Sequence, residues 1–414
     1  MAEIKLPNST QLERVISLLG GDQDVYGIHW DAKDDVITRT GGAIGKTVGA
    51  STGGEPIVSD FDSIAPWSNM QRVVLNDAGV VVARHGDPTY VEDGTLGQVM
   101  VEIPKFYYRS FKTATGYQFE ITPNKKDGFK VHHAFKKGST ELDRVFCSAF
   151  NGSIFDTSAS DYLLADEQVA DFTATTGDKL SSIAGAKPCS GLTQVLTIVN
   201  SRVLANNRGA GWQLFDFGVA TALQMLLFIE FASFNSQAVI GQGVVNKTDD
   251  GASNMSENNG ATSFLGNKSG RQAGTNGLTS ISYRGVENFW GNIHSFVDGI
   301  NIQNHIPFLA TDGYASDKFT DNYESIGTNI SLTTGYISDL IMNDNFDFGI
   351  LGSKTSGSSS TRIPDRQTQA AGNRVAHFGG FWTLGLDAGF ARWLFSTAAS
   401  SRFRSTSARL CYKK

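Results

Sequence analysis

The segment RVAHFGGFWTLGLDAGFARWL, residues 374–394, decides how this chain is interpreted, together with the Ala408-Arg409-Leu410 that follows it. Glycines and tryptophans recur in it at short intervals, and the residues between them are bulky, chemically unlike and without the period of a helix or strand. Glycine permits tight turns, and the tryptophans are expected to be buried and to hold the loops. A fixed frame with unrelated side chains is typical of a binding surface. The alternative is the closing strand and loop of a β-rich core.

The composition favours a protein that works outside a cell. Of the 414 residues 40% are hydrophobic, which supports a substantial core, whereas 18% are charged, below the roughly 25% of ordinary globular proteins. The 45 glycines and 27 phenylalanines give a chain rich in loops and aromatic side chains, as expected of extracellular and virion proteins rather than metabolic enzymes. The net charge of −6 argues against extensive nucleic-acid binding, so we expect no nucleic-acid partner.

The charge is unevenly distributed. Residues 361–414 hold seven arginines and two lysines against two aspartates, a net charge of +7 that leaves −13 for the rest of the chain. Arginine among aromatic residues is a common interface composition. The alternative is that these positive charges balance the negative charge of a neighbouring acidic subunit.

The sequence predicts neither a signal peptide nor membrane insertion. The first residues, MAEIKLP, contain no apolar core of a signal peptide. The most apolar run, residues 215–234, contains Gln224 and Glu230, which favours a buried helix over a membrane span. The three cysteines are too few for a disulfide framework. We therefore expect synthesis in a host cytoplasm and release by lysis, as part of a phage particle.

Apolar periodicity and turn residues predict an α+β chain with short strands and long ordered loops. The expected helices are residues 9–19, 192–204 and 212–234. The expected strands are 26–30, 36–39, a hairpin of 72–75 with 79–84, a central strand over 97–109 paired with 117–122, and a strand over 143–150. The expected loops are 249–276 and 352–360.

No catalytic signature is present, so we predict that the protein is not an enzyme. The seven histidines lack metal-ligand spacing, and no nucleophile elbow occurs. Two oxygen-rich groups could bind Ca²⁺, namely Glu287, Asn288, Asn292 and Asp298 in the first, and Asp249, Asp250 and Glu257 in the second. Hydrogen bonds that fix loops explain the first group better, and a solvated loop explains the second. We therefore expect no cofactor, with a structural Ca²⁺ as the alternative.

The pattern Arg374-Val-Ala-x-x-Gly-Gly-x-Trp-x-x-Gly-x-Asp-Ala-Gly389 resembles the variable region of C-type-lectin-fold proteins that are diversified by retroelements in phages and bacteria. The other matching motifs are Tyr283-Arg-Gly-Val-Glu-Asn-Phe-Trp-Gly-Asn292, Val297-Asp-Gly299, residues 97–105, residues 361–365 and Ala408-Arg409-Leu410. The resemblance covers most of the chain from about Tyr26. It implies a C-type lectin-like domain of the subtype found in formylglycine-generating enzymes over residues 96–414. A docking or oligomerisation segment over 1–50 and a small β-hairpin region over 51–95 would precede it.

The resemblance also implies which residues bind the ligand. In this family, errors at template adenines rewrite Asn codons, which never yields Lys, Glu, Gln, Met or Trp. The positions inferred to be variable are Phe381, Thr383, Leu384, Asp387, Arg392, Leu394, Ser396, Arg402, Phe403 and Arg404, all reachable from an Asn codon. The inferred scaffold is Gly380, Trp382, Gly385, Gly389, Trp393, Arg409, Trp290 and Asn292.

The implied function is that of a phage tail receptor-binding protein. Its partners would be a host-surface protein or glycan and other tail proteins, and it would form a homo-oligomer, a trimer by preference. One alternative is an enzyme of the formylglycine-generating type, but such enzymes use a cysteine pair and only Cys411 lies near the expected end of the chain. The other alternative is a structural virion protein without a diversified site. The calcium-binding sugar motifs Glu-Pro-Asn and Gln-Pro-Asp are absent.

Overall fold

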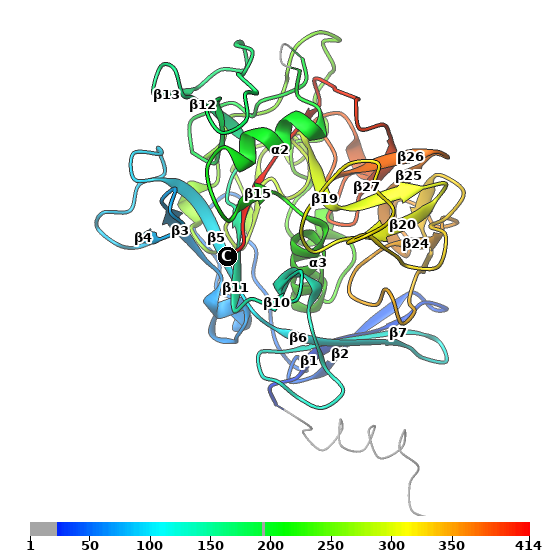
Figure 1. Ribbon diagram of the computed structural model, residues 1–414. Coiled ribbons are helices and arrows are strands. Elements are labelled where there is room, and N and C mark those ends of the chain that lie inside the picture. The colour runs from blue at the N-terminus through cyan, green and yellow to red at the C-terminus, as the bar shows by residue number, and fades with distance from the viewer. Residues whose placement is uncertain (1–22, 193–194) are drawn as a thin grey trace, which may run out of the picture.

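The computed structural model describes residues 23–192 and 195–414. Over these residues the protein is mainly β-sheet with few helices, an α+β arrangement. Figure 1 shows the helix α3 (Phe217–Phe231) in the middle of the molecule, with sheets on several sides of it. The helix expected over residues 9–19 lies outside the described residues. No helix in the described ranges is long and apolar enough to cross a membrane.

A five-stranded antiparallel sheet contains the first strands of the chain. Its order is β2 (Val36–Gly41), β1 (Tyr26–Asp31), β7 (Gly116–Thr122), β6 (Tyr107–Lys112) and β8 (Lys130–Val131). The strands expected over 26–30, 36–39 and 117–122 are confirmed. Trp30 on β1 is fully buried and packs against Phe234 just after α3. Residues 26–41 are therefore part of the folded core, and the docking or oligomerisation role expected of residues 1–50 stays a prediction.

A six-stranded sheet brings together distant parts of the chain. Its order is β15 (Trp212–Leu214), β29 (Leu410–Tyr412), β11 (Arg144–Ser148), β5 (Gln98–Pro104), β3 (Gln71–Leu75) and β4 (Val81–Arg84). The hairpin and the strand expected over 143–150 are confirmed. Since β3 pairs with β5, the predicted boundary at residue 95 does not separate sheets.

An eight-stranded sheet carries the C-terminal segment. Its path runs β21 (Glu324–Ser325), β20 (Ile306–Leu309), β19 (His294–Gln303), β26 (Asn373–Phe378), β27 (Trp393–Thr397), β25 (Ile363–Gln369) and β22 (Gly335–Ile337), and β28 (Thr406–Ser407) pairs with β19. Figure 1 shows β25, β26 and β27 together on one side of the molecule. The segment between β26 and β27 and the segment between β27 and β28 hold most of the inferred variable positions.

The remaining elements are short. The paired strands are β9 (Lys136–Lys137) with β10 (Thr140–Glu141), β12 (Ser153–Asp156) with β13 (Asp161–Leu163) and β14 (Lys179–Ser181), β16 (Gly270–Arg271) with β17 (Ile281–Tyr283) and β18 (Val286–Glu287), and β23 (Asp339–Leu340) with β24 (Gly352–Lys354). The other helices are α2 (Ile198–Asn206), α4 (Ser236–Val239) and the 3-10 turns η1 (Asp60–Ser63), η2 (Trp67–Asn69), η3 (His133–Phe135), η4 (Ser263–Leu265) and η5 (Gly385–Asp387).

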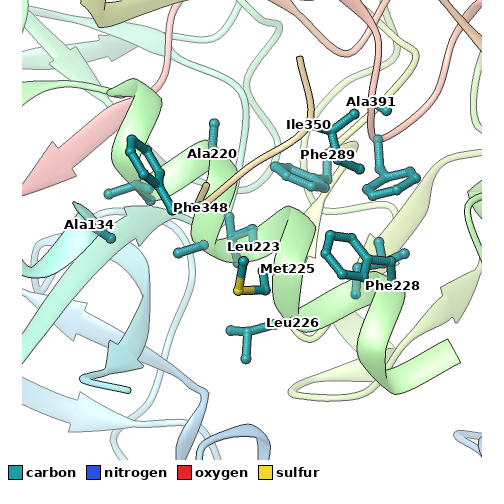
Figure 2. Packing of buried hydrophobic residues seen from close by; sticks show 14 of the residues in the cluster. Ala134, Ala220, Leu223, Met225, Leu226, Phe228, Phe289, Phe348, Ile350 and Ala391 are labelled. Atoms are coloured by element: carbon teal, nitrogen blue, oxygen red, sulfur yellow. The ribbon is translucent and has the colours of Figure 1, made fainter. Parts of the chain in front are cut away.

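The helix α3 forms the centre of the hydrophobic core. All fifteen of its residues are buried, as predicted for the apolar run. Figure 2 shows side chains of α3, among them Leu223 and Phe228, packed with residues from other segments. Its three buried polar side chains have partners. Thr221 Oγ1 donates to the Phe217 carbonyl at 2.9 Å, Gln224 Nε2 donates to the Phe390 carbonyl at 2.7 Å, and Glu230 binds Arg284. The core helix is thus fixed directly to the C-terminal segment.

Three predicted elements are corrected. The single strand over 97–109 is two strands, β5 and β6, in different sheets, because the chain turns after Pro104. The helix over 212–234 begins only at Phe217, since residues 212–214 pair with β29 and Asp216 caps the helix by accepting from Val219 N at 3.0 Å. The helix over 192–204 begins at Ile198 after the cap Thr197. Loops 249–276 and 352–360 contain the short elements η4, β16 and β24.

Candidate functional site

The inferred scaffold residues form a buried frame. Trp382 and Trp393 are 0% exposed, and Trp393 Nε1 donates to the Ile350 carbonyl at 3.1 Å. The Arg409 guanidinium donates to the backbone carbonyls of Glu287 and Asn288. Trp290 and Asn292 are likewise buried, as are Gly380 and Gly389, whereas Gly385 is partly exposed.

Gly389 is required by close packing. A Cβ at this position would lie 2.0 Å from Asp365 Oδ1, whose carboxylate accepts from the Ala391 amide through Oδ2 at 2.7 Å. Burial raises the pKa of Asp365 well above its usual value. The glycine therefore leaves room for a buried carboxyl that fixes the turn before β27.

Nine of the ten inferred variable positions have solvent access. Phe403 is 43% exposed and Arg402 is exposed. The partly exposed positions are Phe381, Thr383, Leu384, Asp387, Leu394, Ser396 and Arg404. On β27 exposure alternates with Leu394 and Ser396 outward and Trp393 and Phe395 inward, as a strand with one solvent face requires.

Arg392 corrects the prediction. Its side chain is buried, with the residue 5% exposed, and donates to the Arg366 carbonyl and to Thr368 Oγ1 at 2.8 Å. Burial lowers its pKa to about 10. Since its hydrogen bonds go to β25, the Arg392 side chain is buried with the frame, unlike the other nine inferred variable positions.

Two buried histidines lie beneath the exposed aromatic positions. The His294 ring centroid lies 5.2 Å from that of Phe381, and the His377 ring lies 6.3 Å from that of Phe403. The two histidine rings are 5.9 Å apart. Burial lowers the pKa of His377 to about 3 and that of His294 well below its usual value, so both rings are neutral at pH 7. They connect the two variable segments by packing.

The oxygen-rich group of the 287–298 segment fixes loops. Glu287 accepts from the Gly260 amide and from Thr262, Asn292 Oδ1 accepts from the Glu257 amide at 2.6 Å, and Asp298 binds Arg202 through both oxygens. Asn288 Oδ1 accepts from the Ile281 amide. Within residues 23–192 and 195–414 no group of three or more His, Cys, Asp or Glu side chains is arranged to hold a metal ion.

The second acidic group contacts the variable segment. Arg404 donates to Asp249 Oδ1 at 2.5 Å, to Asp250 Oδ1 at 3.0 Å and to the Ser253 carbonyl at 2.7 Å. Its guanidinium carbon also lies 5.6 Å from the Trp382 ring centroid. The loop over residues 249–257 is therefore a wall of the variable surface. Its acidic composition was the only sequence signal for this contact.

Cys411 lies opposite a second cysteine. Cys147 on β11 and Cys411 on β29 are paired in register, and both are free and 0% exposed. Burial raises the pKa of Cys147 to about 12 and that of Cys411 well above its usual value. A cysteine pair is thus present, although sequence spacing did not predict it. Neither thiol is poised as a thiolate nucleophile.

No profile of a protein family and no curated sequence matches this chain.

Proposed function

We propose that this chain is the receptor-binding protein of a phage tail, and that its C-terminal surface is diversified by a retroelement. One observation carries the proposal: the side chains inferred to vary have solvent access in nine of ten cases, while the tryptophans and Arg409 of the frame are buried. Exposed residues on a buried frame can change without loss of the core. Phe381, Phe403 and Arg402 supply the aromatic and guanidinium groups that dominate binding energy at protein interfaces.

The architecture supports a C-type lectin-like domain. Few helices, short strands and long loops tied by buried side chains are compatible with that fold. On this proposal the ligand is a host-surface protein or glycan, other tail proteins hold the molecule on the virion, and the molecule acts as a trimer without metal or cofactor.

Adsorption of phage to host cells tests the function. Phage carrying Phe381→Ala and Phe403→Ala should adsorb poorly, because both aromatic side chains have solvent access and aromatic groups dominate binding energy at interfaces. Unchanged adsorption would favour a structural virion protein. Diversification is tested separately by the flanking DNA, where a near-copy of codons 374–410 beside a reverse transcriptase gene should differ only at adenines.

An enzyme of the formylglycine-generating type is the alternative that Cys147 and Cys411 keep open. Oxidative chemistry at a cysteine requires access for substrate, and both thiols are fully buried with raised pKa values. A Cys411→Ser variant that adsorbs normally would separate binding from this chemistry.

A further inference from the structure

A polar depression adjoins the variable surface. It has a volume of about 650 Å³ and is formed by the loop over residues 250–261 together with Lys187, Lys247 and Gln272. This volume lies within the range of roughly 300–1,000 Å³ typical of small-molecule sites. The backbone amide of Lys247 donates to the Trp382 carbonyl at 2.8 Å, so one wall of the depression is hydrogen-bonded to the frame of the variable segment.

The loop that forms the depression is held by hydrogen bonds to other segments of the chain. Asn254 Nδ2 donates to Asp166 Oδ2 at 2.9 Å and to the Pro188 carbonyl at 2.8 Å. Lys187 Nζ donates to the Ser256 carbonyl at 2.7 Å, and Lys247 Nζ to the Met255 carbonyl at 2.6 Å. A preorganised binding site pays a smaller free-energy cost for ordering its loops and side chains when a ligand binds.

The side chain at position 404 contacts two residues that line the depression, Asp250 and Ser253. Arg404 neutralises Asp249 and Asp250 and holds the Ser253 carbonyl, while it lies over the Trp382 ring. A shorter or uncharged residue at this position would release the outer end of the loop. An inferred variable position therefore contacts the loop that lines the depression, although the lining residues themselves lie outside the variable segment.

The chemistry of the lining favours hydroxyl groups. Its side chains include amides, two hydroxyls, carboxylates and ammonium groups, with Met255 and Ala261 as the apolar members. Most of the charges are paired, since Lys247 binds Glu257 and Arg404 binds Asp250, while the Lys187 ammonium group donates to the Ser256 carbonyl. An apolar side chain would strip water from these groups without replacing its hydrogen bonds. A sugar hydroxyl can both donate to and accept from them.

We propose that this depression is a second subsite of the binding surface, that it takes a hydroxyl-rich unit of an oligosaccharide, and that the residue at position 404 determines its specificity by holding the loop. The inference rests on the proposed binding function, and it commits that function to a glycan. Binding of a protein ligand in place of a glycan would contradict this inference.

An array of defined oligosaccharides tests the subsite with the full-length protein. Wild type should bind at least one oligosaccharide, and the affinity for it should fall about tenfold or more in the double variant Glu257→Gln, Asn258→Ala, the effect of losing one or two hydrogen bonds. Asn258 is exposed, so this change spares the core. Lys105→Gln, on the exposed Lys105–Glu141 pair, is the control and should bind as wild type.

Hydrogen exchange tests the role of position 404 without a ligand. Amides of residues 249–257 should exchange faster in Arg404→Ala, whereas the neighbouring exposed Arg402→Ala should leave them unchanged. Equal exchange in both variants would overturn the role of Arg404. Wild type that binds no oligosaccharide would overturn the sugar assignment, and binding that survives the double variant would overturn the subsite. Loss of adsorption on Phe381→Ala would still uphold the receptor-binding function in each case.

Discussion

Arg284 and Glu230 form an ion pair that is buried on both sides. The Arg284 Nη2 and Nε atoms lie 2.5 and 2.8 Å from the two carboxylate oxygens, and the side chains are 4% and 1% exposed. The Tyr283 hydroxyl donates to the same carboxylate at 3.1 Å. This pair fixes the 283–292 motif, identified from sequence, to the core helix α3.

Removal of one partner of this pair should destabilise the protein strongly. Glu230→Gln leaves the buried Arg284 guanidinium with only its longer ion pair to Asp62 at 3.2 Å, so we expect a loss of up to about 3–5 kcal/mol, the cost of removing one partner from a buried pair. Urea denaturation followed by tryptophan fluorescence measures the change in unfolding free energy. The exposed pair of Lys105 with Glu141 provides the control, since Glu141→Gln should change stability by no more than about 1 kcal/mol. A similar loss in both variants would contradict the anchoring role.

Substitution of a buried tryptophan of the frame should reduce stability, whereas substitution of an exposed phenylalanine should reduce binding. Trp393→Ala empties a fully buried site and removes the hydrogen bond to Ile350, so we expect a loss of about 3–5 kcal/mol. Phe403→Ala, at 43% exposure, should cost less than about 1 kcal/mol yet reduce adsorption. Thermal unfolding and phage adsorption are measured on the same variants. A stability loss at Phe403 as large as at Trp393 would place Phe403 in the frame.

Local patterns in the sequence predicted much of the fold. The apolar runs 72–75 and 79–84 on either side of the turn residues 76–79 predicted the β3–β4 hairpin, and the apolar run 215–234 predicted the buried helix. The errors lie where tertiary pairing overrides local preference, because residues 212–214 pair with β29 about two hundred positions later. The break between β5 and β6 is set by which sheet each half joins.

The candidate site could be predicted only in part, again because tertiary contacts decide which side chains are buried. The spacing of Trp382 and Trp393 identified a frame whose burial could be expected from residue type. The burial of Arg392 depends on acceptors at Arg366 and Thr368 in another strand. Contacts between Arg404 and Asp249 join residues far apart in the chain, and no local pattern encodes them.

Acid should destabilise the protein through its buried histidines. Burial lowers the pKa of His377 and of His132 to about 3, below the value of about 6.5 in an unfolded chain. Between these values the unfolded state binds more protons than the native state, so stability should fall as pH decreases from 6.5 toward 3. Urea midpoints across this range measure the slope. His377→Gln should make the slope shallower, whereas the control His29→Gln, at a partly exposed site, should retain it.

A display library over residues 374–410 should divide the segment into tolerant and intolerant positions. The side chains at positions 383, 394 and 396 are partly exposed and that at position 402 is exposed, so replacement changes few core contacts and folded protein should still reach the surface of the displaying cell. Substitution at Trp382 opens a cavity in the frame, and any side chain at Gly389 meets the Asp365 carboxylate at 2.0 Å.

Arg392 is the position at which the codon pattern and the structure predict opposite results in this library. Its codon is reachable from Asn, which predicts tolerance, but its burial and its bonds to Thr368 predict that most replacements reduce display. Sorting for folded protein with an antibody to a C-terminal tag, followed by sequencing, gives the tolerance at each position. Free substitution at Arg392 would return it to the variable set and would show that its contact with β25 contributes little to the fold.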